Sequence, residues 1–222
     1  MTRPWRRFRR NRLAQAGSSL LLLYLLGALF APFLAPYSPY AQDLRSAYVP
    51  PLAGVSLRGP QGEVGLYVSP AYRHPLEGVQ VDWSQKYPVR LLVRGDEWQW
   101  LGLRGNLHLF GVGGPVRLYL LGTDEQGRDL LSRILYGIPV SLSIGLVAVS
   151  IGLFLGAPLG ALSAYFGGRM DLLVQRLVDV MLAFPGTFLA IVLVAILGTG
   201  LGNAMIAVGI TTMPSTPTSS GR

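Results

Sequence analysis

Residues 134–168 carry no charged side chain, because no Asp, Glu, Lys or Arg occurs between Arg133 and Arg169. An α-helix rises about 1.5 Å per residue, so roughly 20 helical residues cross the hydrocarbon layer of a bilayer. The uncharged stretch is longer than that and too apolar for an ordinary surface helix. It therefore predicts a membrane crossing, which the chain enters through the polar loop just before it.

The composition favours the same class of protein. Half of the residues are hydrophobic and only 14% are charged, against about 25% in typical soluble domains. The net charge of +8 could indicate a nucleic-acid-binding protein, but six arginines lie within the first twelve residues, directly before an apolar run. Such a cluster is first a topology signal, and no basic face suited to nucleic acid is evident elsewhere. Cysteine is absent, which excludes disulfides and thiolate metal sites.

The first membrane helix is predicted within residues 13–40, after a basic N-terminus at residues 1–12. A cleaved signal peptide is the alternative, because a basic region precedes the apolar run. The length of the uncharged run and its proline-rich end without an A-x-A site favour a retained helix. The arginines then stay in the cytoplasm, so the chain from residue 40 onward lies outside.

Residues 41–121 differ in kind, since short runs of alternating polarity are separated by Gly and Pro. This period-two pattern predicts half-buried strands, and we expect a small β-rich extracytoplasmic domain inserted between membrane helices. His74 and His108 are far apart in sequence and predict no metal site, while Trp98 and Trp100 share one strand face and predict a small core. The predicted strand runs are 63–69, 79–83, 88–95, 97–103, 106–110 and 115–122.

Residues 122–136 hold the densest polar motif, G-T-D-x-x-G-R-D, followed by an amphipathic helix. One interpretation is a capped helix start, with Thr123 or Asp124 as the N-cap. The other is a functional loop at the mouth of a translocation path, and the two are compatible. The motif residues are Gly122, Thr123, Asp124, Gly127, Arg128 and Asp129.

Residues 137–210 are predicted to form the core helices. Small residues recur every fourth position and predict close helix packing in lipid, at Gly152, Gly156, Gly160 and Ala164. Pro158 is expected to kink that helix, and residues 180–198 form the third spanning candidate. The run 204–210 is too short to cross, and the polar tail at 211–222 fits a membrane protein's end poorly.

The stretch LLGTDEQGRDLLSRILYGIPVSLSIGLVAV resembles the permease subunits of oligopeptide and dipeptide ABC importers that carry a GTDxxGRD motif. The resemblance continues through YFGGRMDLLVQRLVDVMLAFPGTFLAIVLVAILG and GLGNAMIAVGI and covers about residues 1–210. It implies a mainly α fold of polytopic transmembrane helices, the type I importer permease fold, here incomplete. The small external β domain would be an insertion in that fold.

The family's activity follows as an expectation. The resemblance implies a multi-pass subunit of a bacterial or archaeal inner membrane, with its N-terminus in the cytoplasm, that forms half of a peptide path. Its partners would be a second permease, two ATPase subunits, an extracytoplasmic substrate-binding protein and the lipid bilayer. The chain itself would hold no cofactor and be no enzyme, because its only lysine, Lys86, is followed by tyrosine and no P-loop exists. ATP and Mg would bind the ATPase subunits.

The chain departs from the family after residue 210. The family's cytoplasmic coupling loop and last two helices are missing, so the sequence predicts a C-terminally truncated permease with an aberrant tail. Two alternatives stay open. The chain could be a membrane-tethered extracytoplasmic binding or scaffold protein, whose β domain is the active part, or a non-functional permease fragment.

Overall fold

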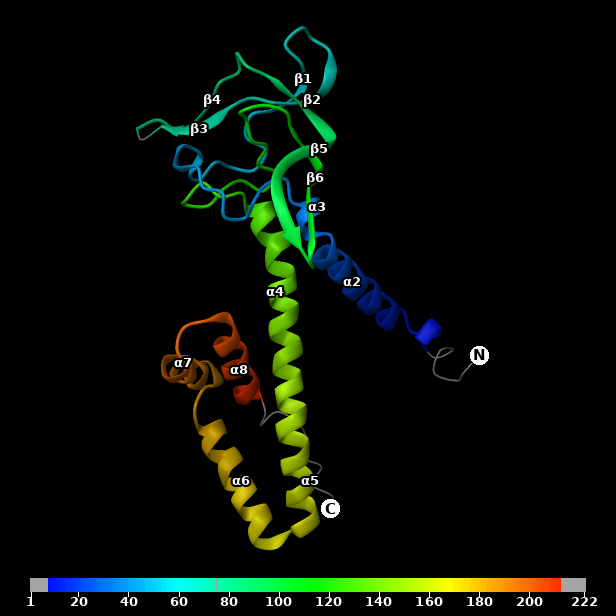
Figure 1. Cartoon of the computed structure of the whole chain (residues 1–222), viewed down its shortest axis with the longest axis vertical. Coiled ribbons are helices and arrows are strands. Elements are labelled where there is room, and N and C mark those ends of the chain that lie inside the picture. The colour runs from blue at the N-terminus through cyan, green and yellow to red at the C-terminus, as the bar shows by residue number, and fades with distance from the viewer. Residues whose placement is uncertain (1–7, 75, 213–222) are drawn as a thin grey trace. The chain divides into compact units, whose positions relative to one another are not determined.

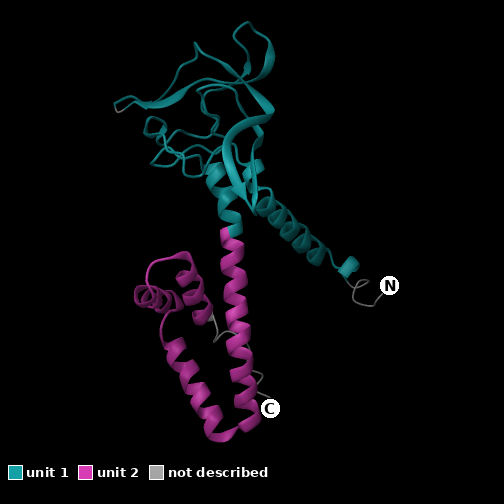
Figure 2. Ribbon diagram, viewed as in Figure 1, with its two compact units in different colours: residues 1–139 teal, residues 140–222 magenta. Residues whose placement is uncertain are grey.

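The computed structural model describes residues 8–74 and 76–212 and divides the chain into two compact units, residues 1–139 and 140–222 (Figures 1 and 2). The boundary falls within the long helix α4 (Leu130–Ile151). The described residues are mostly helical, with one region of sheet. The predicted tail at 211–222 lies outside the described residues from position 213 on, as do Arg3, Arg6 and Arg7.

The first unit begins with helix α2 (Arg12–Leu29), followed by the short α3 (Ala31–Leu34) and a single 3₁₀ turn, Leu44–Ser46. Asn11 caps α2, since its side-chain oxygen accepts hydrogen bonds from the N–H groups of Leu13 and Ala14 at 3.0 and 3.2 Å. No residue of α2 is buried although the helix is rich in leucine. Its apolar surface is therefore available to lipid or to another helix.

Six strands follow in the first unit (Figure 1). Four form an antiparallel sheet in the order β1-β2-β5-β6, and two form a separate hairpin, β3-β4. In the long β5–β6 hairpin Val89 pairs with Val112 and Trp100 with Leu103, with an irregularity between Arg94 and Trp98. The bounds are β1 (Val55–Arg58), β2 (Val64–Val68), β3 (Ala71–His74), β4 (Gly78–Val81), β5 (Tyr87–Trp100) and β6 (Leu103–Val112).

The alternating polarity of the sequence therefore predicted much of the sheet. Three of the predictions need correction. The runs predicted at 88–95 and 97–103 are mainly one strand, β5, because a bulge takes up the break in the pattern. The strand predicted at 115–122 is wrong, since that segment pairs with no strand. Its apolar residues instead enter a small core. The edge strand β1 and strand β3 were not predicted.

That core is built on Val68, Val116 and Leu118, all buried. The residues packed against it come from the sheet and the segment after it, namely Val55, Tyr87, Val89, Phe110, Val112 and Leu120. Trp98 and Trp100 are not part of this cluster, so the predicted tryptophan core is wrong. The ring of Trp98 lies over Gly105, and the ring of Trp100 meets Tyr136 of α4.

The two histidines lie apart. His108 is buried, with Nδ1 2.5 Å from the Ala35 carbonyl oxygen and Nε2 3.0 Å from that of Asp96. Its ring thus joins the end of α3 to the β5–β6 hairpin. Within residues 8–74 and 76–212 no group of three or more His, Asp or Glu side chains could hold a metal ion.

In the second unit α4 continues into a π-helical turn, Gly152–Gly156, and then into α5 (Ala157–Phe166). Pro158 follows the π turn, inside a helical stretch that continues from α4 without a break. The structure shows this π turn just before Pro158, and the kink predicted there stays a prediction. Leu130–Phe166 is a 37-residue apolar helical stretch of membrane-spanning length, as α2 is with 18 residues.

Three further helices complete the second unit, α6 (Gly168–Ala183), α7 (Gly186–Leu197) and α8 (Leu201–Thr212), with α7 packed against α8. The third spanning candidate, predicted at 180–198, contains a bend of 94° between α6 and α7, so its crossing stays a prediction. Phe184 is extended (φ −101°, ψ 137°), the conformation that a following proline favours, and Pro185 cannot continue a helix. By length and composition the described residues contain two spans, or three if the bent pair counts as one.

Replacing Leu118 by Ala tests the core of the first unit. Leu118 is 1% exposed, so the change leaves a cavity and should lower the free energy of unfolding by about 2–5 kcal/mol. The measurement is chemical unfolding of the full chain in detergent, followed by tryptophan emission. Leu121→Ala is the control, because Leu121 is 43% exposed and its loss should cost far less. Equal effects of the two changes would contradict this account of the core.

Candidate functional site: the polar loop before helix α4

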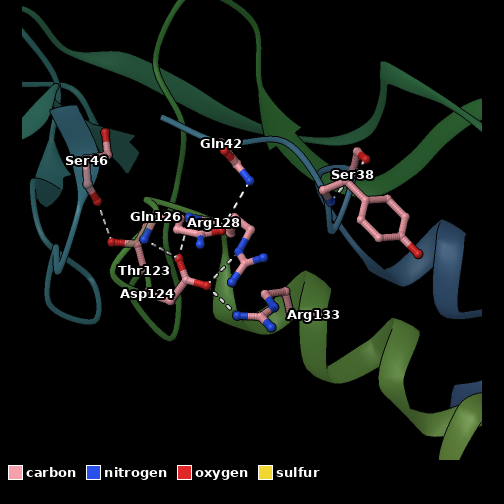
Figure 3. A network of polar contacts seen from close by, with 9 residues as sticks. Ser38, Gln42, Ser46, Thr123, Asp124, Gln126, Arg128 and Arg133 are labelled. Atoms are coloured by element: carbon pink, nitrogen blue, oxygen red, sulfur yellow. Dashed lines mark hydrogen bonds and ion pairs between the residues drawn. The ribbon is translucent and has the colours of Figure 1, made fainter. Parts of the chain in front are cut away.

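The loop at 122–129 folds back on the segment that follows α3 (Figure 3). Thr123 is buried, and its hydroxyl donates to the Ser46 carbonyl and accepts from the N–H of Val49 at 2.9 Å. The Thr123 N–H donates in turn to the Val49 carbonyl at 3.0 Å. Three hydrogen bonds from one residue thus hold two segments together that lie over 70 positions apart in sequence.

Asp124 is the centre of the loop's charges. Its Oδ1 accepts from the N–H groups of Gln126 and Arg128 at 2.9 and 3.0 Å. Its Oδ2 accepts from Nε of Arg128 at 2.7 Å and from Nη1 of Arg133 (Figure 3). Both carboxylate oxygens are therefore occupied, and the motif's acid and base are paired with each other rather than free for a substrate.

The pKa of Asp124 reflects that pairing. Its partial burial alone would raise the pKa, but the hydrogen bonds from the Arg128 backbone and side chain and from Gln126 outweigh it. The net direction is down, so the carboxylate is ionised at neutral pH and binds both guanidinium groups.

Two glycines of the motif are required by close backbone approach. Gly127 has φ +68°, and a Cβ there would collide with the carbonyl oxygen of Asp43. Gly122 has φ +80°, and a Cβ there would lie 2.6 Å from the carbonyl oxygen of Val49. Both positions combine a left-handed backbone with direct contact to the segment after α3, which only glycine permits.

Asp129, not Thr123 or Asp124, is the N-cap of α4, so the capping prediction is corrected. Its Oδ2 accepts from the N–H and the hydroxyl of Ser132 at 2.8 and 2.6 Å, the geometry of a cap three residues before its donor. Asp129 is 1% exposed, and this burial raises its pKa, although the Ser132 hydrogen bonds oppose the shift. Thr123 and Asp124 lie too far before Leu130 to cap the helix, because the chain turns back within the motif before α4 begins.

The cap is tied to the core of the first unit through Tyr37. Ser132 Oγ accepts from the N–H of Tyr37 at 3.2 Å, and the Tyr37 hydroxyl accepts from the N–H of Leu118 at 2.6 Å. Burial raises the pKa of Tyr37 well above its ordinary value, so the hydroxyl stays neutral. One chain of contacts thus runs from the start of α4 to the buried segment after β6.

The structure brings all six predicted motif residues into one loop, and it shows partners that the motif did not indicate. Arg133 lies beyond the motif and Tyr37 long before it, so spacing alone did not connect Arg133 to Asp124 or Tyr37 to Ser132. Of the loop residues, Glu125 points its exposed side chain to solvent. The contacts described for this loop hold three backbone segments together: the loop itself, the segment after α3 and the start of α4.

The predicted packing residues lie in the second unit and do not share one environment. Gly152 and Gly156, which bound the π turn, are buried, Gly160 is half-buried and Ala164 is exposed. Helix α8 contacts the π turn, and a Cβ on Gly209 would lie 2.7 Å from Cδ1 of Ile151. Close approach is thus required at Gly209, which the four-residue period did not include.

Replacing Asp129 by Ala or Asn separates its capping from its charge. Ala removes the acceptor for Ser132 and should destabilise the folded chain by about 1–2 kcal/mol. Asn keeps an oxygen acceptor and removes a buried charge, so its cost should be smaller. Because the folded pKa is raised, ionisation of Asp129 costs stability as pH rises through that pKa, and Asn should remove this component. Thermal unfolding in detergent at several pH values measures both, and equal losses for Asn and Ala would contradict the cap.

Replacing Asp124 by Asn tests the ion pairs. Both arginines lose their ionic partner, and we expect a loss of about 1–3 kcal/mol at neutral pH. Since the folded pKa of Asp124 is lowered, its stabilisation is present above the unfolded pKa and is lost as pH falls through the folded one. The gap between wild type and variant should therefore narrow below about pH 4. Glu125→Gln is the matched control, an equal charge change at an exposed position. A gap independent of pH would contradict the assignment.

Comparison with known proteins finds similarity to transport permeases. Residues 2–51 match the family described as the N-terminal TM domain of oligopeptide transport permease C. The chain is 35% identical over 211 residues to the di/tripeptide transport system permease protein DppC of Pseudomonas aeruginosa, covering 95% of this chain and 50% of that protein. It is 30% identical to the dipeptide permease protein DppC of Haemophilus influenzae, with 95% and 52% covered.

A second kind of match is shorter and closer. The glutathione transport system permease protein GsiD of Pectobacterium atrosepticum is 44% identical over 102 residues, which is 46% of this chain and 34% of that protein. The chain spans about half the length of the first two relatives. With its apolar helices, the chain is an integral membrane protein and a homologue of the permease proteins of dipeptide and oligopeptide transport systems.

Proposed function

We propose that the chain is a permease subunit of an ATP-driven importer that carries di- or oligopeptides into the cell. The observation that carries this proposal is the match of nearly the whole chain to a di/tripeptide transport permease, together with helices of membrane-spanning length. The chain would adopt an importer permease fold and contribute one half of the path through the bacterial or archaeal inner membrane.

The proposed topology follows from charge. Arginines concentrated before α2 would keep the N-terminus in the cytoplasm, so the sheet region and the loop at 122–129 would lie outside. On this proposal the loop's role is mechanical. Its charges are paired with each other, and Thr123 hydrogen-bonds the backbone of residues 46–49. These contacts would fix the external part of the first unit to the start of α4, near the path by which peptide arrives.

The proposed partners follow from what the chain would need. A second permease subunit would complete the path, and a substrate-binding protein would deliver peptide from outside. Two ATPase subunits would bind ATP and Mg and supply the energy, and this chain would be no enzyme. Support comes from the sequence, where the only lysine is followed by Tyr87 instead of the Ser or Thr of a P-loop.

A membrane-tethered binding protein is the second candidate, favoured by one observation. The sheet region has its own core on Val68, Val116 and Leu118. In that case the full chain in detergent would bind a ligand without any other subunit. A permease subunit would instead need its partners for any transport step.

Deleting the coding region of this chain in its own host tests the proposal. Uptake of a labelled dipeptide or tripeptide should fall to the level of a strain that lacks the ATPase subunits, and re-expression should restore it. A tagged chain should co-purify with a second permease and the ATPase subunits from detergent-solubilised membranes. Unchanged uptake, or a chain that purifies from membranes without any of these subunits, would refute the proposal.

A further inference from the structure

The tip of the β5–β6 hairpin is strained and apolar. Leu101 and Gly102 form a two-residue turn with φ +49° and +84°, between the paired residues Trp100 and Leu103. Such turns have positive φ at both central positions and strongly favour Asn-Gly. Leucine in this conformation costs about 1–2 kcal/mol. Leu101 is also 75% exposed, so its side chain packs little within the described chain.

The residues around the turn share an amphipathic character. Leu103 is 69% exposed, and Arg104, next in the chain, is the one charged residue of the segment 98–104. Trp98 donates from Nε1 to the Leu107 carbonyl at 3.2 Å, which fixes its ring on the hairpin. Exposed leucines backed by tryptophans and a flanking arginine are the residue types that gather where a membrane meets water.

The tip lies beside α2 and the first turns of α4, all within the first unit (Figure 1). The ring of Trp100 meets that of Tyr136 in α4 edge to face, with centroids 6.0 Å apart. Two residues further along α4, Cδ1 of Ile138 lies 3.2 Å from where a Cβ of Gly27 in α2 would be. The hairpin tip is thus at the level where α2 and α4 are adjacent.

That level corresponds to the bilayer boundary. Helix α2 is of membrane-spanning length with 18 residues and ends at Leu29, so Gly27 in its last turn lies near one end of that span. Tyr136, two residues before Ile138 in α4, then lies near the boundary between hydrocarbon and headgroups. Trp100, packed on Tyr136, is at the same depth.

We propose that the hairpin tip, residues 98–104, is a lipid anchor that places Leu101 and Leu103 at the boundary between headgroups and acyl chains. The inference rests on the proposed membrane function. Transfer of the two exposed leucine side chains from water into the lipid is favourable. This gain offsets the conformational cost of Leu101 in the turn. Arg104 then lies where a lipid phosphate can pair with it.

Single cysteines test the anchor, since the chain has no native cysteine. We would label Leu101→Cys with an environment-sensitive fluorophore in the full chain, reconstituted in vesicles of phosphatidylethanolamine and phosphatidylglycerol. Leu57→Cys is the matched control, because Leu57 is 71% exposed on the opposite edge strand β1. Leu21→Cys in α2 is the membrane reference.

At position 101 we expect blue-shifted emission and several-fold stronger quenching by a lipid-borne quencher than by iodide, with the reverse at position 57. Preferential iodide quenching at 101, while position 21 reports lipid, would overturn the anchor alone. A label at 101 protected from both quenchers would overturn it as well, since a protein would then cover the tip. If position 21 also reports water, the proposed membrane function itself fails.

Leu101→Asn provides an independent variant. Asn-Gly suits the turn better, so a purely structural role predicts unchanged or higher thermal stability in detergent. The anchor predicts the same stability but weaker quenching of Trp98 and Trp100 emission by lipids brominated near their headgroups. Unchanged quenching in this variant would contradict the anchor.

Discussion

The paired carboxylate of Asp124 is the interaction on which the first unit depends. A helix that enters lipid cannot leave charges or unpaired N–H groups along its length, so these must be satisfied before it begins. In this chain the short loop at 122–129 provides these partners. Asp124 takes up the guanidinium groups of Arg128 and Arg133, and Asp129 caps the helix. The next 35 or so residues can then be free of charge, as the sequence pattern requires.

This arrangement also explains why the loop needs the segment after α3. The Thr123 hydroxyl finds its partners outside the loop, in the backbone of Ser46 and Val49, whereas Oδ1 of Asp129 is buried without a hydrogen-bond partner among the described residues. Gly122 and Gly127 allow the two segments to touch at backbone distance. The motif's glycines and its polar residues therefore serve one purpose, the docking of one backbone segment on another.

Sequence reasoning located the features that follow from local periodicity and missed those set by tertiary contact. The charge-free gap predicted the long helix, and alternation predicted most of β2, β5 and β6. The same alternation at 115–122 misled, because Val116 and Leu118 are buried by packing on the sheet and not by pairing within it. Residue 185 is a proline, but a proline alone does not fix the angle of 94° between α6 and α7. The link from Tyr37 to Ser132 has no local signal at all.

A water-soluble protein exposes its charged side chains and buries its leucines. The first unit does the opposite, with paired ionic groups inside the loop and leucines exposed on the hairpin and on α2. In water each choice costs free energy, the first by desolvation and the second by exposed apolar surface. Next to a bilayer both costs fall. The exposed leucines would meet an apolar medium, and the carboxylate of Asp124 is paired with two guanidinium groups within the loop and the first turn of α4. On the lipid-anchor proposal, a single cause, the nearby lipid boundary, accounts for both the internally paired charges of the loop and the strained Leu101 turn.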